Sequence, residues 1–247
     1  MSCWEVIDTG TRSAEENMHL DAQLLSNADK RSQPVLHLYE WEGKSATYGY
    51  FTNPAQFLNL ENIQHCGLSL ARRPTGGGIT FHLWDMAFSV FVPSSCPEFS
   101  QNTLDNYAFV NAAVLNAVKE FLAHTPPLFL TLEDLGSWDT NCHHFCMAKP
   151  TKYDVMWEGK KIAGAAQRKT RQGFLHQGTI ALSMPSLEVL SQLLLPGTKV
   201  FDAMQAYTCP LLGKNPTEEE IQGGKKTLRT LLATHLGNSS DILRQIN

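Results

Sequence analysis

The chain has 247 residues, of which 43% are hydrophobic and 18% charged, a composition typical of globular proteins and not of disordered or fibrous ones. This length allows one substantial core or two small ones. The formal net charge of −4 gives no bulk attraction to nucleic acid or to an anionic membrane, so neither is expected as a partner.

The N-terminal segment has no basic region followed by an apolar run, so no signal peptide is expected. No stretch approaches the ~18 apolar residues of a membrane span. The cysteines are too scattered for a disulfide framework, and we expect them to be thiols in a reducing cytoplasm. These residues are Cys3, Cys66, Cys96, Cys142, Cys146 and Cys209.

Short apolar strands and capped helices alternate along the chain. Ser13 and Glu16 form a capping box that predicts the first helix. The strands at 35–41 and 45–50 are expected to form a hairpin about the turn at 42–44. Further strands are expected at 4–7, 68–72, 87–92, 128–132, 153–157, 160–167 and 174–182.

Further helices are expected after an N-cap at Asn53 and at 103–123, 186–194 and 217–236. The helix at 103–123 should be the longest, and the last should be interrupted at Gly223 and Gly224. Because most strands follow one another without crossover helices, the pattern predicts an α+β fold with helices packed on a largely antiparallel sheet. We expect a single domain over 1–247, with 200–247 as its helical C-terminal tail.

A glycine-rich segment, RRPTGGG at 72–78, is the first candidate for a functional site. Three consecutive glycines indicate a need for positive φ, or for backbone N–H groups close to an anionic or carbonyl oxygen. Successive side chains of a strand point to opposite faces, so only one of the two arginines should reach the site. A flexible turn between two strands is an equally good interpretation. The candidates are Arg72, Arg73, Gly76, Gly77 and Gly78.

The segment KKIAGAAQ at 160–167 forms a strand with almost no side-chain bulk on either face. Another group, such as an acyl chain, could lie against its backbone. Lys161 is expected on the face that carries Ala163 and Ala165. The alternative is close packing against a helix, with Lys161 in solvent.

Cys146 lies in an aperiodic stretch, 133–152, and could fold back toward Lys161. An ammonium within ~4–6 Å would lower the thiol pKa by ~1–3 units and make the sulfur a nucleophile near neutral pH. A rival interpretation is a metal site formed by Cys142, His143, His144 and Cys146. Adjacent residues do not readily converge on one tetrahedral ion, and no second ligand pair stands out, so no metal is expected.

Together these segments resemble the lipoate-protein ligase A and octanoyltransferase family, which shares its fold with biotin-protein ligases. Residues 72–78 are similar to its RR-x-[TS]-G-G-G motif, and 161–167 to K-[IVL]-[ASV]-G-[SA]-A-Q, whose lysine is essential. Residues 174–180 are similar to L-[QH]-H-G-[ST]-[IL]. The resemblance implies a main sheet with a smaller one beside it, and it adds His82, Gly164, Ala165, His176 and Gly178 to the expected substrate-binding residues.

The segment CMAKPTKYD at 146–154 resembles the C-F-x-x-P-[ST]-x-[YF]-[DE] segment of octanoyltransferases, whose cysteine holds the acyl group. ATP-dependent lipoate ligases usually have an Asn-Asp pair where Tyr153 and Asp154 stand. Three positions depart from the family pattern. Leu83 replaces an aspartate after His82, Met147 replaces a phenylalanine, and the order His176-Gln177 inverts the usual one.

The resemblance implies that Cys146 and Lys161 are catalytic and transfer an octanoyl group from octanoyl-acyl carrier protein without a cofactor. The acceptor would be a lysine in the lipoyl domains of 2-oxoacid dehydrogenase complexes or in the glycine cleavage H protein. The alternative is a lipoate-protein ligase that uses ATP and Mg²⁺, with the glycine loop and Lys161 at the adenylate phosphate and Cys146 a bystander. A third interpretation is an inactive protein that retains the acyl pocket.

Overall fold

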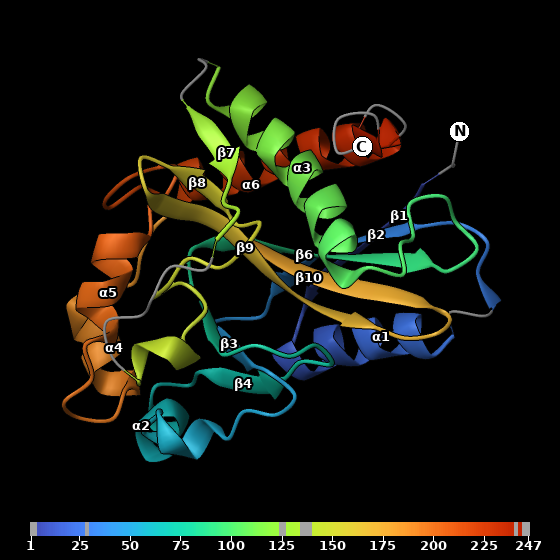
Figure 1. The fold of residues 1–247 in the computed structure, drawn as a ribbon. Helices are drawn as coiled ribbons and strands as arrows, with labels where there is room; N and C mark the ends of the chain where they lie inside the picture. Colours follow the sequence, from blue (N-terminus) through green and yellow to red (C-terminus); the bar gives the residue numbers. More distant parts are fainter. Residues whose placement is uncertain (1–3, 28–29, 124–126, 134–139, 240–241, 244–247) are drawn as a thin grey trace.

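A seven-stranded sheet and a three-stranded sheet form the centre of the computed structural model, which describes residues 4–27, 30–123, 127–133, 140–239 and 242–243 (Figure 1). Cys3 and residues 134–139 of the expected irregular loop lie outside this part of the chain. The large sheet has the order β1 (Glu5–Arg12), β2 (Val35–Trp41), β6 (Asp85–Pro93), β10 (Gly173–Ala181), β9 (Lys160–Lys169), β8 (Val155–Trp157) and β7 (Leu128–Leu130). The small sheet has the order β4 (Ser69–Arg72), β3 (Ser45–Tyr48) and β5 (Ile79–His82).

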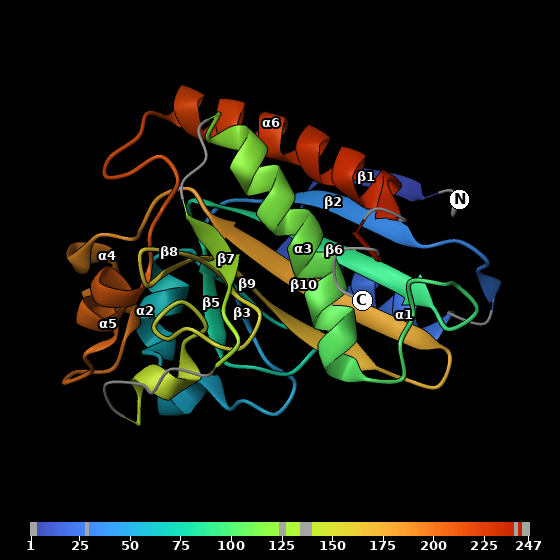
Figure 2. The same cartoon turned by 45° about the horizontal axis from the view of Figure 1, so that its top comes forward.

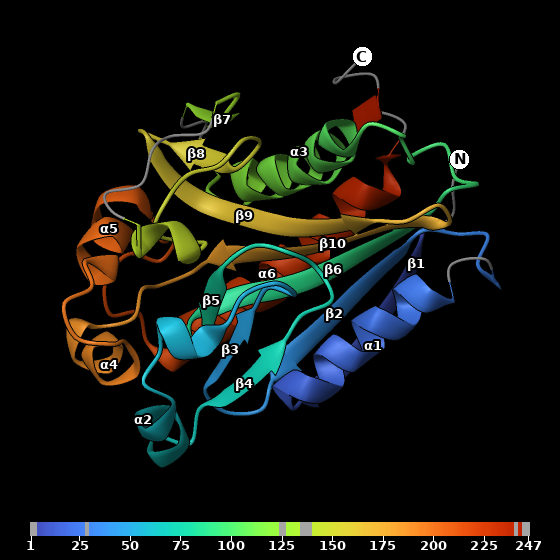
Figure 3. The same ribbon diagram turned by 60° about the horizontal axis from the view of Figure 1, so that its bottom comes forward.

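Helices cover both faces of the large sheet. The α-helices are α1 (Ala14–Ser26), α2 (Leu60–His65), α3 (Thr103–Phe121), α4 (Leu187–Leu193), α5 (Val200–Tyr207) and α6 (Glu218–Gly237), and the short 3₁₀ helices are η2 (Pro54–Gln56) and η3 (Cys142–His144). Helices α3 and α6 lie side by side on one face (Figure 2), whereas α1 and the small sheet lie on the other (Figure 3). In the large sheet only β1 and β2 are parallel, so the predicted α+β fold with a largely antiparallel sheet is confirmed.

The structure contains the predicted features that depend only on residues close together in the sequence. The Ser13 hydroxyl accepts from the Glu16 N–H and the Glu16 side chain accepts from the Ser13 N–H, so the capping box of α1 is present. The turn between β8 and β9 has left-handed conformations at Glu158 (φ 49°) and Gly159 (φ 76°), as the predicted hairpin requires.

The expected hairpin of β2 and β3 is wrong. Strand β2 joins the large sheet between β1 and β6, whereas β3 pairs with β4 and β5 in the small sheet. The reason is that the two strands bury their side chains in different cores. Leu36 and Leu38 pack under α3 and α6, whereas Ala46 packs in a second core with Phe57 and Phe145.

Two expectations about helices are also wrong. Helix α6 runs without a break through Gly223 and Gly224 and has 20 residues, one more than the 19 of α3. Burial of Leu228 and Leu232 against the core outweighs the helix-breaking tendency of the two glycines. Helix α5 and strand β5 were not predicted, and β5 occupies part of the expected connection after the glycines.

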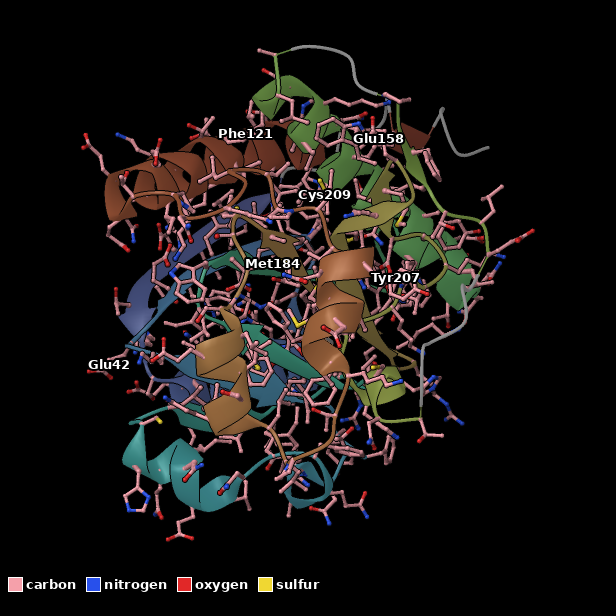
Figure 4. All side chains as sticks on the ribbon, turned by 90° about the vertical axis from the view of Figure 1, so that its left-hand side faces the viewer. Glu42, Phe121, Glu158, Met184, Tyr207 and Cys209 are labelled. Carbon is pink, nitrogen blue, oxygen red and sulfur yellow. The ribbon has the colours of Figure 1, made fainter. Side chains whose placement is uncertain are left out.

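The second core lies at the end of the molecule covered by α4 and α5. Figure 4 looks onto this end and shows Met184 beside the two helices and Tyr207 at the end of α5. Met204 and Leu190 bring α5 and α4 against the small sheet. No helix in the described ranges is long and apolar enough to cross a bilayer.

Candidate active site

Cys146 lies in a loop that is anchored where the two sheets meet. Its N–H donates to the carbonyl of Ile79 in β5 at 3.0 Å, and the neighbouring carbonyl of Met147 accepts from the Thr208 hydroxyl at 2.6 Å. Phe145 and Ala148 are fully buried on either side. These contacts fix the position of the sulfur, although the loop itself has no regular hydrogen-bond pattern.

Lys161 reaches the same place because of an irregularity in β9. The pairing with β8 shifts register between Val155 and Met156, which pair with Ala163 and Lys161 respectively. This bulge places Lys161 on the face of Gly164, where a Cβ would lie 2.2 Å from the Lys161 Cε. The expectation that Lys161 shares a face with Ala163 and Ala165 is therefore wrong, because it assumed uninterrupted alternation.

The Lys161 ammonium is buried and paired. Its Nζ lies 2.8 Å from the Oδ2 of Asp154 and donates to the carbonyl of Cys146 at 2.8 Å. The Asp154 carboxylate also accepts from the Thr151 N–H and hydroxyl. Burial raises the pKa of Asp154 above its ordinary value, although the Lys161 charge and the Thr151 hydrogen bonds act in the opposite direction.

Arg73, and not Arg72, is the arginine that reaches the sulfur. The NH2 of Arg73 donates to the Cys146 Sγ at 3.5 Å. Arg73 is buried, with 4% of the residue's surface exposed. Arg72 points to solvent, with its guanidinium 4.7 Å from the centre of the Tyr50 ring. The prediction that only one of the two arginines would reach the site is confirmed by these positions.

The surroundings of Cys146 favour the thiolate. Burial by itself would raise the pKa of the thiol, but the positive charges of Arg73 and Lys161 oppose it. Hydrogen bonds from the Thr80 hydroxyl and the Gly78 N–H act in the same direction as the charges. The pKa of Cys146 therefore lies below its ordinary value, as a nucleophilic cysteine requires.

The three glycines serve different purposes. Gly77 has φ of 85°, and a Cβ there would lie 2.8 Å from the NH2 of Arg73. A Cβ at Gly78 would lie 2.1 Å from the carbonyl oxygen of His144, so only glycine allows the Cys146 loop to approach. A Cβ at Gly76 would have no atom within 4 Å. The Gly76 carbonyl accepts a hydrogen bond from the Arg73 Nε at 3.0 Å.

A narrow pocket opens beside the sulfur. It has about 30 Å³ of free space, room for about two water molecules, so an acyl chain enters only if side chains move. Its walls are formed by the small residues of β9, by the cationic side chains of Arg73 and Lys161, and by methionine and aromatic side chains. The lining residues are Met18, Tyr39, Trp41, Thr47, Arg73, Thr80, His82, Cys146, Met147, Lys161, Gly164, Ala165, Ala166, Gln177, Gly178 and Thr179.

His176, an expected substrate-binding residue, does not line the pocket beside Cys146. The ring is fully buried on the other face of β10, between Phe88 and Tyr107 at centroid distances of 6.4 and 5.4 Å. Gln177, the next residue, lines the pocket instead. A Cβ at Gly178 would also meet the Phe88 ring, so this glycine contributes backbone alone to the pocket.

His82 lines the pocket as expected, in an unexpected setting. Its Nε2 lies 2.9 Å from the Thr47 hydroxyl and its Nδ1 lies 2.7 Å from the Oδ2 of Asp85. The Trp41 ring stacks on the imidazole at 4.2 Å. Asp85 stands three residues after His82, so its spacing was visible in the sequence, whereas nothing local identified Thr47.

The four residues of the rival metal interpretation point to different surroundings. Cys142 is buried in the second core, His143 contacts Lys149, and His144 stacks on Phe57 at 4.3 Å. In the described part of the chain, no three His, Cys, Asp or Glu side chains are grouped closely enough to hold a metal ion.

Comparison with known proteins identifies relatives over most of the chain. The lipoyl protein ligase A/B catalytic domain family matches residues 13–210. Octanoyltransferase LipM of Bacillus subtilis (strain 168) is 29% identical over 204 residues, which cover 82% of this chain and 73% of that protein. Octanoyltransferase LipM of Lysinibacillus sphaericus (strain C3-41) is 31% identical over 196 residues, 77% of this chain and 70% of that protein.

Solved structures show the same fold. A lipoate-protein ligase A bound with ATP has a TM-score of 0.64 at 20% identity, with 99% of this chain and 93% of that chain covered. Ta0514, a putative lipoate protein ligase from T. acidophilum with bound lipoic acid, has a TM-score of 0.63 at 20% identity, with 100% and 94% covered.

Proposed function

Because the chain belongs to the lipoyl protein ligase A/B catalytic domain family, we propose that it is an octanoyltransferase that carries the acyl group on Cys146. The observation that carries this proposal is the half-buried Cys146 sulfur, 3.5 Å from the Arg73 guanidinium, with a lowered thiol pKa. Relatives named octanoyltransferase LipM support the same activity. The inactive interpretation has less support, because the nucleophile and its cations are all in contact.

The first step is a thioester exchange. The Cys146 thiolate attacks the carbonyl carbon of octanoyl-acyl carrier protein, a C–S bond to Cys146 forms, and the C–S bond to the donor's thiol breaks. The leaving thiolate takes up a proton. One thioester replaces another, so the step is close to balanced in free energy and uses no ATP. Lys161 and the Gly78 N–H lie beside the sulfur, where they can stabilise the oxyanion of the tetrahedral intermediate.

The second step forms an amide. The ε-amine of a lysine on the acceptor attacks the Cys146 thioester, a C–N bond forms, the Cys146 thiolate leaves, and the amine releases its proton. The amide is more stable than the thioester, so this step is downhill. The acceptors we propose are lipoyl domains of 2-oxoacid dehydrogenase complexes or the glycine cleavage H protein.

Two exposed arginines can receive the donor's phosphate. The guanidinium groups of Arg72 in β4 and Arg168 in β9 lie 4.7 and 5.2 Å from the centre of the Tyr50 ring. Arg73 is not available for this contact, because its guanidinium is buried against Cys146. Guanidinium groups bind phosphate oxygens in a bidentate manner, which suits the phosphopantetheine arm of an acyl carrier protein.

Acyl-chain binding requires the pocket to open. Met18 and Met147 line it, and methionine side chains are flexible enough to move aside. Gly164 and Ala166 leave the opposite wall without bulk. We propose that displacement of the two methionine side chains admits the octanoyl chain along β9.

Intact-mass spectrometry tests the covalent step. Incubation with octanoyl-acyl carrier protein and no ATP is expected to add one octanoyl group to the protein, and to add none to Cys146→Ala. Cys66→Ala, at the end of α2, is the matched control and should be modified like the native protein. Normal transfer to a lipoyl domain by Cys146→Ala would refute the acyl-enzyme.

Two further measurements test the other two interpretations. Pyrophosphate release that depends on ATP, Mg²⁺ and free lipoate would establish the ligase. Binding of the acceptor domain without modification, with either donor, would establish the inactive protein.

A further inference from the structure

The Arg73 guanidinium is held in one orientation by contacts to each of its nitrogens. The Nε donates to the Gly76 carbonyl at 3.0 Å, and NH1 donates to the Thr47 hydroxyl at 3.3 Å and to the Thr47 carbonyl at 3.4 Å. The remaining nitrogen, NH2, donates to the Cys146 Sγ at 3.5 Å. The direction of this last bond therefore depends on the groups that hold the other two nitrogens.

The Thr47 hydroxyl is itself part of a longer hydrogen-bonded chain. It lies 2.9 Å from the Nε2 of His82, and the Nδ1 of His82 lies 2.7 Å from the Oδ2 of Asp85. The Thr179 hydroxyl donates to the same carboxylate oxygen. Thr47, His82 and Asp85 are each at most 7% exposed, and the stacked Trp41 ring prevents the imidazole from turning.

The donors of this chain all run in one direction. Burial would raise the pKa of Asp85, but the adjacent His82 and the hydrogen bond from Thr179 keep it below its ordinary value, so Asp85 is a carboxylate that accepts from the His82 Nδ1–H. In the neutral tautomer that donates Nδ1–H to Asp85, Nε2 accepts the Thr47 hydroxyl proton. The Thr47 oxygen is left with its lone pairs for Arg73.

We propose that Asp85, His82 and Thr47 form a positioning chain that holds the Arg73 guanidinium against the Cys146 sulfur. None of these three residues is hydrogen-bonded to the sulfur. They act on it through Arg73. The inference rests on the proposed function for its effect on acyl transfer, but the state of the thiol can be measured without it.

The positioning chain also accounts for the departure at Leu83. An aspartate is expected next to His82, but in this chain the carboxylate comes from Asp85, the first residue of β6, which reaches back to the imidazole across the turn between β5 and β6. The carboxylate is therefore displaced by two positions and still contacts the histidine.

Among the described residues, three charged or titratable groups act on the Cys146 thiol: Arg73 after β4, Lys161 in β9 and Tyr107 in α3. Asp154, before β8, is paired with Lys161. Lys161 and Asp154 form a separate pair that does not contact Thr47 or His82 through any hydrogen bond described above. A change in the positioning chain should therefore alter the contribution of Arg73 and leave that pair in place.

The test is the pH dependence of Cys146 alkylation by iodoacetamide, followed by mass spectrometry of the peptide that contains Cys146. Thr47→Val removes the hydroxyl and keeps the backbone carbonyl, and Asp85→Asn removes the carboxylate. Each is expected to raise the thiol pKa by roughly one unit, which makes alkylation below the pKa about tenfold slower. Thr47→Ser should restore the native profile.

Glu120→Gln is the matched control, because it removes the carboxylate of another histidine pair, His235 with Glu120 at 3.0 Å, between α3 and α6. It is expected to keep the native alkylation profile. A native profile in Thr47→Val, or the same shift in Glu120→Gln, would overturn the proposal. If Asp85→Asn loses its circular dichroism spectrum, the comparison of Thr47→Val with Thr47→Ser decides.

The two proposals fail separately. A shifted alkylation profile together with no octanoyl adduct on the native protein would support the positioning chain and refute the octanoyltransferase. An octanoyl adduct together with a native profile in Thr47→Val would do the reverse.

Discussion

Replacing His176 with phenylalanine is expected to make the protein less sensitive to acid. The ring is fully buried, and burial lowers its pKa from 6.5 to about 3, so the folded protein keeps it neutral. The unfolded chain exposes this histidine, which takes up a proton near its ordinary pKa. The depressed folded pKa means that the native residue contributes its full stability above pH 6.5 and loses it as the pH falls toward 3.

The size of the effect follows from the two pKa values. A pH of 4.5 is two units below the ordinary His176 pKa of 6.5, so the histidine is protonated in the unfolded chain. The same pH is still above the folded-state pKa of about 3, so the histidine stays neutral in the folded protein. The free energy of unfolding should fall by ~2.7 kcal/mol between pH 7.5 and pH 4.5 through this residue alone. Phenylalanine keeps a ring beside Phe88 and Tyr107 and has no such loss.

Urea unfolding of both proteins at the two pH values measures the difference. The stability of the native protein relative to His176→Phe should decrease by ~2.7 kcal/mol on acidification, because all other groups titrate equally in the two proteins. His65→Gln, an exposed position at the end of α2, is the control and should follow the native protein. Parallel pH dependence of the native protein and His176→Phe would refute the buried neutral imidazole.

Three further substitutions test the local structure. Gly78→Ala should abolish octanoylation of Cys146, because its Cβ would lie 2.1 Å from the His144 carbonyl oxygen, and a native rate would contradict this packing. Gly223→Ala should raise the free energy of unfolding by ~1 kcal/mol in urea, since the position is exposed and unobstructed within α6. Ser13→Ala should lower it by about 1 kcal/mol through loss of the α1 cap, and an unchanged urea midpoint would exclude that role.

Features that depend on neighbouring residues were predictable from the sequence. The Ser13 cap of α1 and the turn at Glu158 and Gly159 each use contacts within a few residues. The segments at 72–78 and 161–167 were recognisable for the same reason, because their unusual composition is local; the first contributes Arg73 to the pocket lining and the second contributes Lys161, Gly164, Ala165 and Ala166. The position of Cys146 in the loop before β8 predicted that it folds back toward Lys161, and the Lys161 ammonium donates to the Cys146 carbonyl.

Only the tertiary structure decided which side chains share a face. The bulge in β9 moves Lys161 from the face of Ala163 to the face of Gly164, and the pairing of β10 with its neighbours turns His176 away from the pocket. Strand periodicity does not reveal a bulge, since one extra residue reverses the alternation after it.

Long-range pairing was equally inaccessible to the sequence. Strands β2 and β3 are separated by three residues, yet they belong to different sheets, because each buries its side chains in its own core. Thr47 reaches Arg73 and His82 only through the pairing of β3 with β4 and β5. The sequence by itself determined the fold class and the caps, and it identified Cys146 as the candidate nucleophile. Packing of distant strands decided that Arg73 is the arginine beside the sulfur and that Asp85 supplies the carboxylate behind it, since neither contact is encoded by local spacing.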